Sequence, residues 1–562
     1  MATKKTPEEM VTEIKSRFSQ LKTDRDKFVD RWQEAEQYVA PTVYNWSDLD
    51  SIPEVPTRYE SSPCQKLKTL VAGLVGYSIS PNLVWFKFSL QDQQLLNMYG
   101  VKDWLEECEK YVQAEYNRSN LYSEAAKLVE NAAIDGHSVI LIEDDIDRGK
   151  LRFSTMRNTE IYLDVDDYGE VDTVFREYLM TVRNAVKFFG FNNLDEQIQE
   201  KYKNVQCWNE KIRILYAVYP REEYDVNIKN AQNMPYAAVY IDLDHNKLIE
   251  EKGFNEMPFA VFQWDRISGL PYSNSPAISA MPDIKALNII RSSSLKIAQT
   301  SAEPPLVVPS YIKTVNLIPR GRTYVDDPQK DIIQPIKTGE NYPITLQVLQ
   351  DYEQKVKDWF FVDFFLMLQA KQGQMTATEV MELQGEKSAT LANLVVALNE
   401  TLNKIIKRSF NILAKNGKIP QPPETLRDTD AAMKIDFVGP LAQAQQKFHA
   451  MGGITQALNL ISPIMQLFPN SADYIEGDKL MLQAMEGQGM PQAVIREEED
   501  VKKIREARAQ AEAQAKAQAE QQAMTQQIMQ NANKLGENPQ KGSVMDALNS
   551  QLRGGLNGTG SV

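Results

Sequence analysis

The chain has 562 residues, which is enough for three or four folded units and excludes a peptide or a one-domain module. Lys and Arg total 62 against 76 Asp and Glu, and the resulting net charge of −14 excludes a global basic surface that wraps nucleic acid. The three cysteines, Cys64, Cys108 and Cys207, lie far apart without a CxxC pair. This spacing excludes a disulfide framework and a cysteine zinc site, and it indicates a reducing, intracellular compartment.

No segment of the sequence has the length and composition of a membrane anchor. The first residues, MATKKTPEEM, lack an apolar core, so a secretory signal is not expected. The strongest apolar run, Trp359–Leu368, is interrupted by Asp363 and is much shorter than the ~20 residues that a spanning helix needs. The longest uncharged stretch, 448–472, contains glycines and prolines. We therefore predict no membrane span.

The chain begins with a helical pattern. Residues 6–39 carry apolar positions at helical spacing with charged residues between them, which predicts an amphipathic helix that Pro41 ends. Residues 67–90 change from a helical pattern to a turn at Ser80-Pro81 and then to strand-like alternation. Gly73 and Gly76 lie inside the helical part, without GxGxxG or a following Lys-Ser/Thr, so close packing of helix backbones is expected there and not a phosphate loop.

Two β-rich stretches follow. Residues 138–182 read as β-hairpins separated by acidic turns, and residues 213–264 form a second alternating stretch. The turn 164–172 has the Asp and Gly positions of a calcium loop, but Tyr168 and Phe175 stand where oxygen ligands are needed. A solvated hairpin tip is the expected structure.

The middle of the chain predicts two helices around an irregular insert. Residues 283–302 form a helical pattern that Pro304-Pro305 ends, and residues 304–343 hold seven prolines. Residues 344–370 then predict one long amphipathic helix.

A further long helix is expected after a break at 371–376. Thr376 and Glu379 match a capping box, and apolar positions continue to about Lys415, where Asn416-Gly417 provides a stop. At 1.5 Å per residue this helix would be roughly 55 to 60 Å long, which suits a structure that spans a large assembly.

Residues 497–534 are the most biased segment. Eight Ala and eight Gln occur within 507–530, so helix propensity is high while the apolar stripe is thin. Two interpretations stay open: a solvated or partly disordered tail helix, or a helix that packs beside copies from neighbouring chains. Small Ala contacts suit a wide barrel better than a two-stranded coiled coil. Residues 535–562 are predicted to be a flexible tail.

The sequence offers little for catalysis, and we expect no enzyme, cofactor or metal site. The three histidines have no metal-ligand spacing, and the nucleophile-elbow, P-loop and kinase motifs are absent; the histidines are His137, His245 and His449. The acidic runs 143–145 and 164–167 leave open a divalent ion or nuclease chemistry, although solvated turns are expected.

Two further features have a functional and a structural reading. Asp363 stands among aromatic residues and could be a perturbed acid, but its helical spacing favours a position away from the core or a partner Lys or Arg. The methionines at 481, 485 and 490 are expected to provide adaptable packing.

Several short phrases, taken together and in order, resemble the portal or head-to-tail connector proteins of short-tailed double-stranded DNA phages. They are Arg31-Trp32 to Pro41, Leu70–Gly76 with Ser80-Pro81 and Trp85-Phe86, Asp167–Arg176, Ser275-Pro276 with Pro282–Lys285 and Asn288, Pro304-Pro305, and Met375–Val380. One departure is Tyr272–Pro276, where the family more usually has Tyr-Gly-Arg-Ser-Pro.

The resemblance implies an α+β, helix-dominated subunit with the parts of a portal. These are the wing (1–282), stem helix 1 (283–303), the clip (304–343), stem helix 2 (344–370), the tunnel loop (371–376), a long wing helix and return segment (377–446), the crown (447–496), a barrel helix (497–534) and the tail (535–562).

The resemblance further implies a homo-oligomeric ring, typically of twelve copies, at one capsid vertex of the virion, assembled in the host cytoplasm. Terminase drives double-stranded DNA through such a channel without sequence specificity, and the ring contacts the major capsid protein and tail or adaptor proteins. Candidate DNA-facing residues are Lys371, Gln372, Gln374 and Met375. Candidate partner contacts in the clip are Lys313, Arg320 and Arg322.

The acidic composition suits a conduit, because each Lys or Arg that neutralises a phosphate strengthens DNA binding and would impede sliding. Two alternatives remain at this point: an adaptor or scaffolding protein of the head-tail junction, and a metal-dependent DNA-processing enzyme that uses the acidic turns.

Overall fold

The computed structural model describes residues 6–41, 46, 49–51, 57–96, 98–145, 148–225, 228, 230–316, 322–327, 329–330, 333–335, 342–369, 377–427, 433–441, 481 and 498–534. The chain divides into two compact units, Met1–Gly487 and Gln488–Val562. The fold is α+β with helices predominating, as predicted.

The first helix confirms the predicted amphipathic start. Helix α1 spans Pro7–Val39 and begins with a capping box, in which Thr6 N donates to Glu9 Oε2 (2.8 Å) and Glu9 N donates to Thr6 Oγ1 (3.3 Å). Its buried face, which includes Phe18 and Leu21, packs on one side of a five-stranded sheet.

A second group of helices follows. The predicted change from helix to strand over 67–90 is confirmed by α2 (Ser62–Ser78) and β1 (Phe86–Leu90). Helices α3 (Gln93–Leu96), α4 (Val101–Arg118) and α5 (Leu121–Asp135) come next. A Cβ on Gly73 would lie 2.3 Å from Phe365 Cδ1, so packing is close there, but the nearest atoms belong to a side chain and not to the expected helix backbone. The same expectation is wrong for Gly76 in the described part of the chain, because no atom lies within 4 Å of such a Cβ.

The two predicted β-rich stretches form antiparallel sheets, in the orders β3-β2-β9 and β4-β5-β6-β7-β8. The strands are β2 (His137–Asp145), β3 (Lys150–Thr155), β4 (Ile161–Val165), β5 (Val171–Thr181), β6 (Lys211–Pro220), β7 (Tyr236–Asp242), β8 (Lys247–Phe254) and β9 (Phe259–Gln263). Short helices α6 (Val182–Phe189) and α7 (Glu196–Lys203) lie between β5 and β6, with single 3-10 turns at Asn158–Glu160, Phe191–Asn193, Val205–Cys207 and Ala231–Asn233.

Side chains bond the backbone at both edges of the three-stranded sheet. Asn120 Nδ2 donates to Phe153 O of β3 (2.7 Å), and Phe153 N donates back to Asn120 Oδ1 (3.0 Å). On the other edge, Thr401 Oγ1 donates to Val261 O of β9 (3.3 Å). Edge groups that would otherwise pair with another strand are therefore partly used within the subunit.

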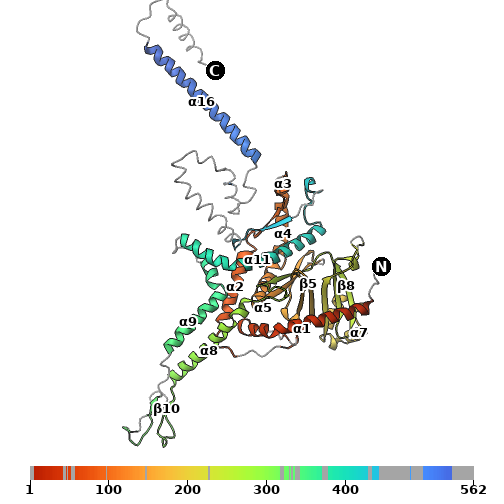
Figure 1. The fold of residues 1–562 in the computed structure, drawn as a ribbon, viewed down its shortest axis with the longest axis vertical. Helices are drawn as coiled ribbons and strands as arrows, with labels where there is room; N and C mark the ends of the chain where they lie inside the picture. The colour runs from red at the N-terminus through yellow and green to blue at the C-terminus, as the bar shows by residue number, and fades with distance from the viewer. Residues whose placement is uncertain are drawn as a thin grey trace, which may run out of the picture. The chain divides into compact units, whose positions relative to one another are not determined.

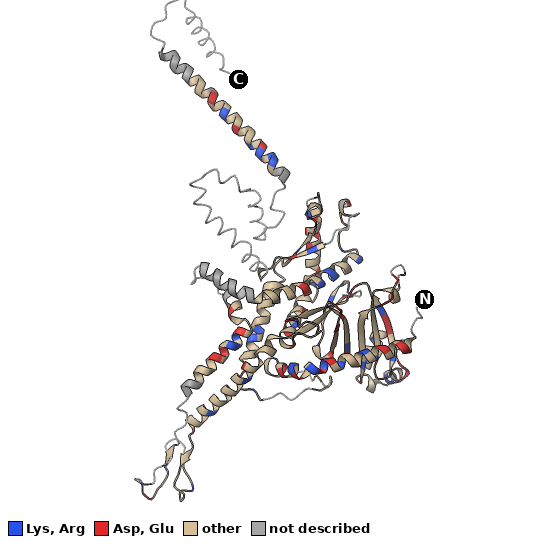
Figure 2. Cartoon of the chain, viewed as in Figure 1, with Lys and Arg blue, Asp and Glu red and all other residues tan. Residues whose placement is uncertain are grey.

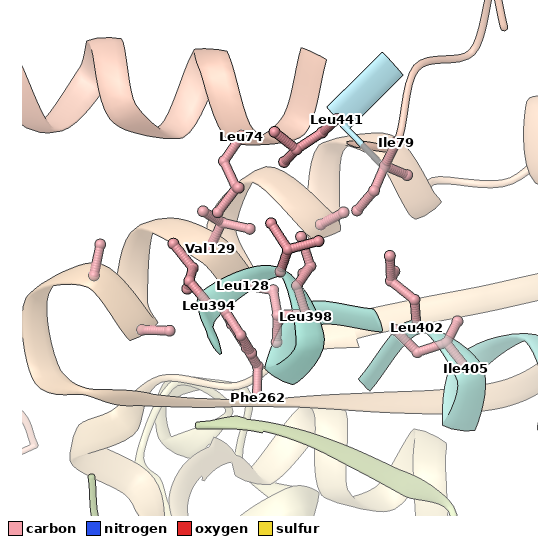
Figure 3. Close-up of a cluster of buried hydrophobic side chains, with 14 of the residues drawn as sticks. Leu74, Ile79, Leu128, Val129, Phe262, Leu394, Leu398, Leu402, Ile405 and Leu441 are labelled. Atoms are coloured by element: carbon pink, nitrogen blue, oxygen red, sulfur yellow. The ribbon is translucent and has the colours of Figure 1, made fainter. Parts of the chain in front are cut away.

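Helix α11 (Ala377–Lys415) confirms the predicted long helix and supplies much of the main core. Its aliphatic residues, including Leu394, Leu398 and Leu402, pack with Leu74 of α2 and Leu128 of α5 (Figure 3). It ends at Lys415, and Gly417 two residues later has a φ of 69°, which gives the left-handed stop. After α12 (Glu424–Arg427), strand β12 (Met433–Phe437) pairs with β1.

The predicted helix pair around a proline-rich insert is present, but its bounds differ. Helix α8 spans Pro276–Ala302 and so starts seven residues before the predicted position 283. The reason is local: Ser275 Oγ accepts a hydrogen bond from Ile278 N (3.0 Å), Pro276 occupies the first helical turn, and Pro282 is accommodated inside the helix.

The prediction of one helix over 344–370 is wrong. Helix α9 (Tyr342–Trp359) ends, Phe361 has a left-handed φ of 51°, and α10 begins at Val362 and runs to Gln369. Helices α8 and α9 run side by side away from the body, and the short ladder of β10 (Leu306–Val307) with β11 (Gln334–Pro335) lies at their far end (Figure 1).

The second unit contains α16 (Glu498–Lys534), which confirms the predicted helix. The side chains described from Lys502 onward are exposed. In the described part of the chain, no helix combines the length and hydropathy needed to cross a membrane.

Candidate functional site: the stem and its base

The pair α8 and α9, here called the stem, is anchored in the main core at one end only. Ile284 and Leu287 of α8 and Leu349 and Val356 of α9 are buried there. Other apolar side chains of the two helices are exposed, among them Ile289 (64%), Leu295, Leu346 and Val348. The stem therefore presents apolar surface that the subunit itself does not cover.

Four charged residues from four segments meet where the stem joins the body; they are Glu60, Lys66, Arg291 and Glu353, here called the stem-base cluster. Arg291 Nε donates to Glu60 Oε2 (2.7 Å), and its terminal nitrogen donates to Glu353 Oε1 (2.8 Å). Lys66 Nζ donates to Glu353 O (3.1 Å) and to Ser62 Oγ (3.3 Å). The cluster balances two positive with two negative charges and ties α2, α8 and α9 together.

Burial and hydrogen bonding act on the pKa values of this cluster in different proportions. Desolvation lowers the pKa of Lys66, against the attraction of Glu353 and Glu60. Burial alone would raise the pKa of Glu60, but hydrogen bonds from Ser62 and Arg291 outweigh it and hold that pKa below its usual value. Sequence reasoning missed this cluster, because its members are scattered along the chain and none belongs to a motif.

The break between α9 and α10 has its own polar contacts. Trp359 Nε1 donates to Asp283 Oδ2 (3.0 Å), which clamps the end of α9 to α8. Gln354 Nε2 donates to Asp358 Oδ1 (3.2 Å) and to Asp363 Oδ2 (2.9 Å), so it bridges the break. Asp363 thus lies apart from the buried aromatic residues beside it, as expected, but it accepts a hydrogen bond from a glutamine rather than from the Lys or Arg suggested as an alternative.

All four candidate DNA-facing residues lie outside the residues that the structure describes. Lys371, Gln372, Gln374, Met375 and Thr376 lie outside the described residues, as does Arg320 of the clip. Glu379 belongs to α11, but its side chain is not described. The two remaining clip candidates, Lys313 and Arg322, are exposed.

The acidic turn 164–172 forms the tip between β4 and β5, as predicted. Asp166 Oδ1 accepts hydrogen bonds from Tyr168 N (2.9 Å) and Glu170 N (2.8 Å), and Asp164 pairs with Arg17 (3.1 Å). The other acidic run, 143–145, lies at the end of β2. Within the described ranges, no group of three or more His, Cys, Asp or Glu residues is arranged to hold a metal ion.

The contacts of two histidines are those of residues that stabilise the fold. His245 Nδ1 lies 2.7 Å from Asp242 Oδ2 in the turn after β7. His137 is fully buried near Trp32 and Tyr272, and burial lowers its pKa to about 3. His449 lies outside the described residues, and so do two of the three methionines, whereas Met481 is 60% exposed.

The comparisons with known proteins agree over most of the chain. Residues 11–495 match the family described as "Bacteriophage head to tail connecting protein". The chain is 28% identical over 505 residues to the portal protein of Salmonella phage epsilon15, covering 87% of this chain and 90% of the relative. It is 25% identical over 477 residues to the probable portal protein of Bordetella phage BPP-1, covering 83% of this chain and 85% of the relative. Because the family match extends across the sheets, the stem and α11, the chain belongs to the bacteriophage head-to-tail connecting protein family.

Proposed function

We propose that this chain is a phage portal subunit, whose copies close into a ring at one capsid vertex. The genome enters through the ring during packaging and leaves through it at ejection. The observation that carries this proposal is the extent of the similarity to portal proteins, which covers 83 to 87% of this chain and is not confined to one module. The ring assembles in the host cytoplasm and becomes part of the virion, where it contacts the major capsid protein. It binds terminase first and tail or adaptor proteins afterwards.

The stem supports ring formation. A closed ring of about twelve copies needs two different surfaces that meet head to tail. Exposed apolar side chains of α8 and α9, such as Ile289 and Leu346, supply surface for such contacts. Few charged residues lie along α8, whereas α9 carries both signs (Figure 2). Side-by-side stems would bury the apolar positions at low electrostatic cost.

Helix α16 supports a barrel built from copies of itself. From Ala507 its sequence follows a four-residue pattern, ARAQ-AEAQ-AKAQ-AEQQ. Successive residues of a helix are turned by 100° about its axis, so residues four apart differ by only 40° and form one row along the helix. The first and third positions of the pattern give two alanine rows, which lie about 200° apart around the axis. One alanine row can contact each neighbour, and the charged row and the glutamine row then face opposite sides of a barrel wall.

Uncharged lining suits DNA that must slide. The glutamine row consists of Gln510, Gln514, Gln518 and Gln522, and the charged row alternates as Arg508, Glu512, Lys516 and Glu520. We assign the glutamine row to the lumen, since amides form exchangeable hydrogen bonds without releasing counterions from DNA. Lys371, Gln372, Gln374 and Met375 remain the proposed tunnel-loop contacts. Lys313, Arg320 and Arg322 remain the proposed contacts with acidic surfaces of docking partners.

Negative-stain imaging of the purified full chain, with its solution mass measured in parallel, tests the proposal. Closed rings of about a dozen copies with a central hole, formed without other proteins, are expected. Such rings would also exclude an adaptor that only decorates a ring made by another protein. A uniform monomer at physiological salt would overturn the proposal. DNA cleavage with magnesium or manganese would favour a metal-dependent enzyme, so it is assayed on the same sample.

A further inference from the structure

The break between α9 and α10 has no cause in the local sequence. No glycine or proline occurs between Pro343 and Gly373, and the residues around the break read KDWFFVDFF. Their spacing predicts one continuous helix. The chain nevertheless leaves the helix after Trp359 and resumes it at Val362. Something outside this segment must therefore impose the break.

Phe361 carries the backbone strain of the break. Its φ of 51° lies in the left-handed region, which is disfavoured for a bulky L-residue. In the described part of the chain, Asn246 is the other non-glycine residue with a positive φ, of 55°, and asparagine tolerates this conformation in turns. Strain at a bulky residue persists only where surrounding contacts hold it.

Packing of α10 on α2 supplies those contacts. Phe360 and Phe365 are fully buried, and Phe364 is 2% exposed. The ring of Phe365 lies over Gly73, where any Cβ would approach its Cγ to 2.4 Å, and it stacks with Tyr77 at 6.4 Å between ring centroids. The bend thus depends on the missing side chain at Gly73.

We propose that Phe361 is the hinge of a two-state element. In the bent state, α10 is docked on α2 through Phe365. In the second state, α10 leaves Gly73, Phe361 takes a normal helical conformation, and α9 continues through it into α10. The bent state is the one that the described contacts hold, and the straight state is the proposed alternative. The role of the hinge rests on the proposed function, because α10 ends at Gln369, shortly before the predicted tunnel loop at 371–376 in the sequence.

The two states differ in which amides are bonded. In the bent state, Val362, Asp363 and Phe364 form the first turn of α10, so their N–H groups have no carbonyl four residues earlier in the same helix. In the straight state, the carbonyls of Asp358, Trp359 and Phe360 would accept from them. Straightening therefore slows hydrogen exchange at these three amides, whereas simple unfolding of α10 speeds exchange throughout Val362–Gln369.

Gly73→Ala tests the hinge, and Gly76→Ala is the matched control. Both glycines lie in α2, but no atom lies within 4 Å of a Cβ at position 76. Hydrogen exchange of the full-length protein is followed by mass spectrometry on peptides covering 355–369. We expect Gly73→Ala to slow exchange at 362–364 by at least about threefold, with Gly76→Ala unchanged. Faster exchange across α10 in Gly73→Ala, or no difference between the two variants, would overturn the proposal.

A second pair of variants keeps the test independent of the clash at Gly73. Phe361→Gly and Phe361→Ala remove the same ring, but glycine favours the left-handed conformation and alanine the helical one. Exchange at 362–364 should be slower in Phe361→Ala than in Phe361→Gly. Equal exchange in the two variants would contradict the hinge. The mass of the assembled oligomer is measured on each sample. Failure to assemble and failure of the hinge can therefore be distinguished.

Discussion

Among the described helices after the stem, α11 and α16 are the two longest, and they have similar lengths but differ in the contacts that stabilise them. They have 39 and 37 residues. In α11, Leu398 and Ile405 are fully buried and Leu402 is 1% exposed. In α16 the apolar side chains Ile504 and Met524 are 37% and 68% exposed. Helix α11 is stabilised by a buried aliphatic stripe. Within this subunit, α16 is stabilised mainly by the high helix propensity of its alanines.

The stem lies between these extremes, since its base is in the core and its outer part is uncovered. The comparison indicates that the body of the subunit is held by its own contacts, while the outer stem and α16 carry side chains that the subunit leaves exposed. We propose that other copies cover these surfaces. Substitutions in these three parts should therefore separate stability of the subunit from stability of the assembly.

The largest effect is expected in α11. Leu398→Ala removes a fully buried side chain and should lower the free energy of unfolding by about 2 to 5 kcal/mol, because a cavity remains in the core. Denaturant unfolding followed by circular dichroism measures this loss. Val396→Ala, at a position on the same helix that is 54% exposed, should change stability by less than about 0.5 kcal/mol. Similar losses for both variants would contradict the buried stripe.

A smaller effect is expected at the base of the stem. Arg291→Ala leaves Glu60, whose side chain is 8% exposed, without its cation, and should cost roughly 1 to 2 kcal/mol. Limited proteolysis should also cut α8 and α9 faster in this variant. Lys296→Ala on the exposed part of α8 is the control and should leave both measurements unchanged. Equal behaviour of the two variants would show that the stem-base cluster does not anchor the stem.

The interior of the body should respond to pH. Burial raises the pKa of Glu109 to about 7, although Phe88 N donates to its carboxylate (2.7 Å). The folded state then binds more protons than the unfolded state between about pH 4.5 and 7, so stability falls as pH rises through this window. Glu109→Gln should flatten this dependence and raise stability at pH 8 by about 1 kcal/mol.

Glu107→Gln is the control for this pH effect, since Glu107 is exposed on the same helix. Urea unfolding at pH 4, 6 and 8 compares the two variants with the original chain. A pH profile that Glu109→Gln leaves unchanged would remove Glu109 as its source.

The smallest effect on subunit stability is expected in α16. Ala513→Gln with Ala517→Gln adds bulk to one alanine row without adding charge, and should change the unfolding of the body by less than about 0.5 kcal/mol. In assembled rings, however, hydrogen exchange of residues 507–522 should become faster, since the helices could no longer approach closely. Gln514→Ala with Gln518→Ala in the glutamine row should leave exchange slow. Fast exchange of α16 in rings of the original chain would contradict the barrel.

Local pattern predicted most of the described elements. The apolar spacing of the first helix, the alternating strands and the stop at Gly417 depend on residues close in sequence, so α1, the hairpins, α11 and α16 could be predicted. The order of the portal-like phrases also identified the family, which the match over residues 11–495 confirms.

Only the tertiary structure decided where the chain departs from its local preference. The pairing of β1 with β12, the stem-base cluster and the break at Phe361 each join segments far apart along the chain. Around Phe361 the local sequence favours a continuous helix. The burial of Phe365 against Gly73 outweighs this local preference. Sequence periodicity determines which face of an element is apolar, whereas the partner that covers that face is chosen by packing between distant segments.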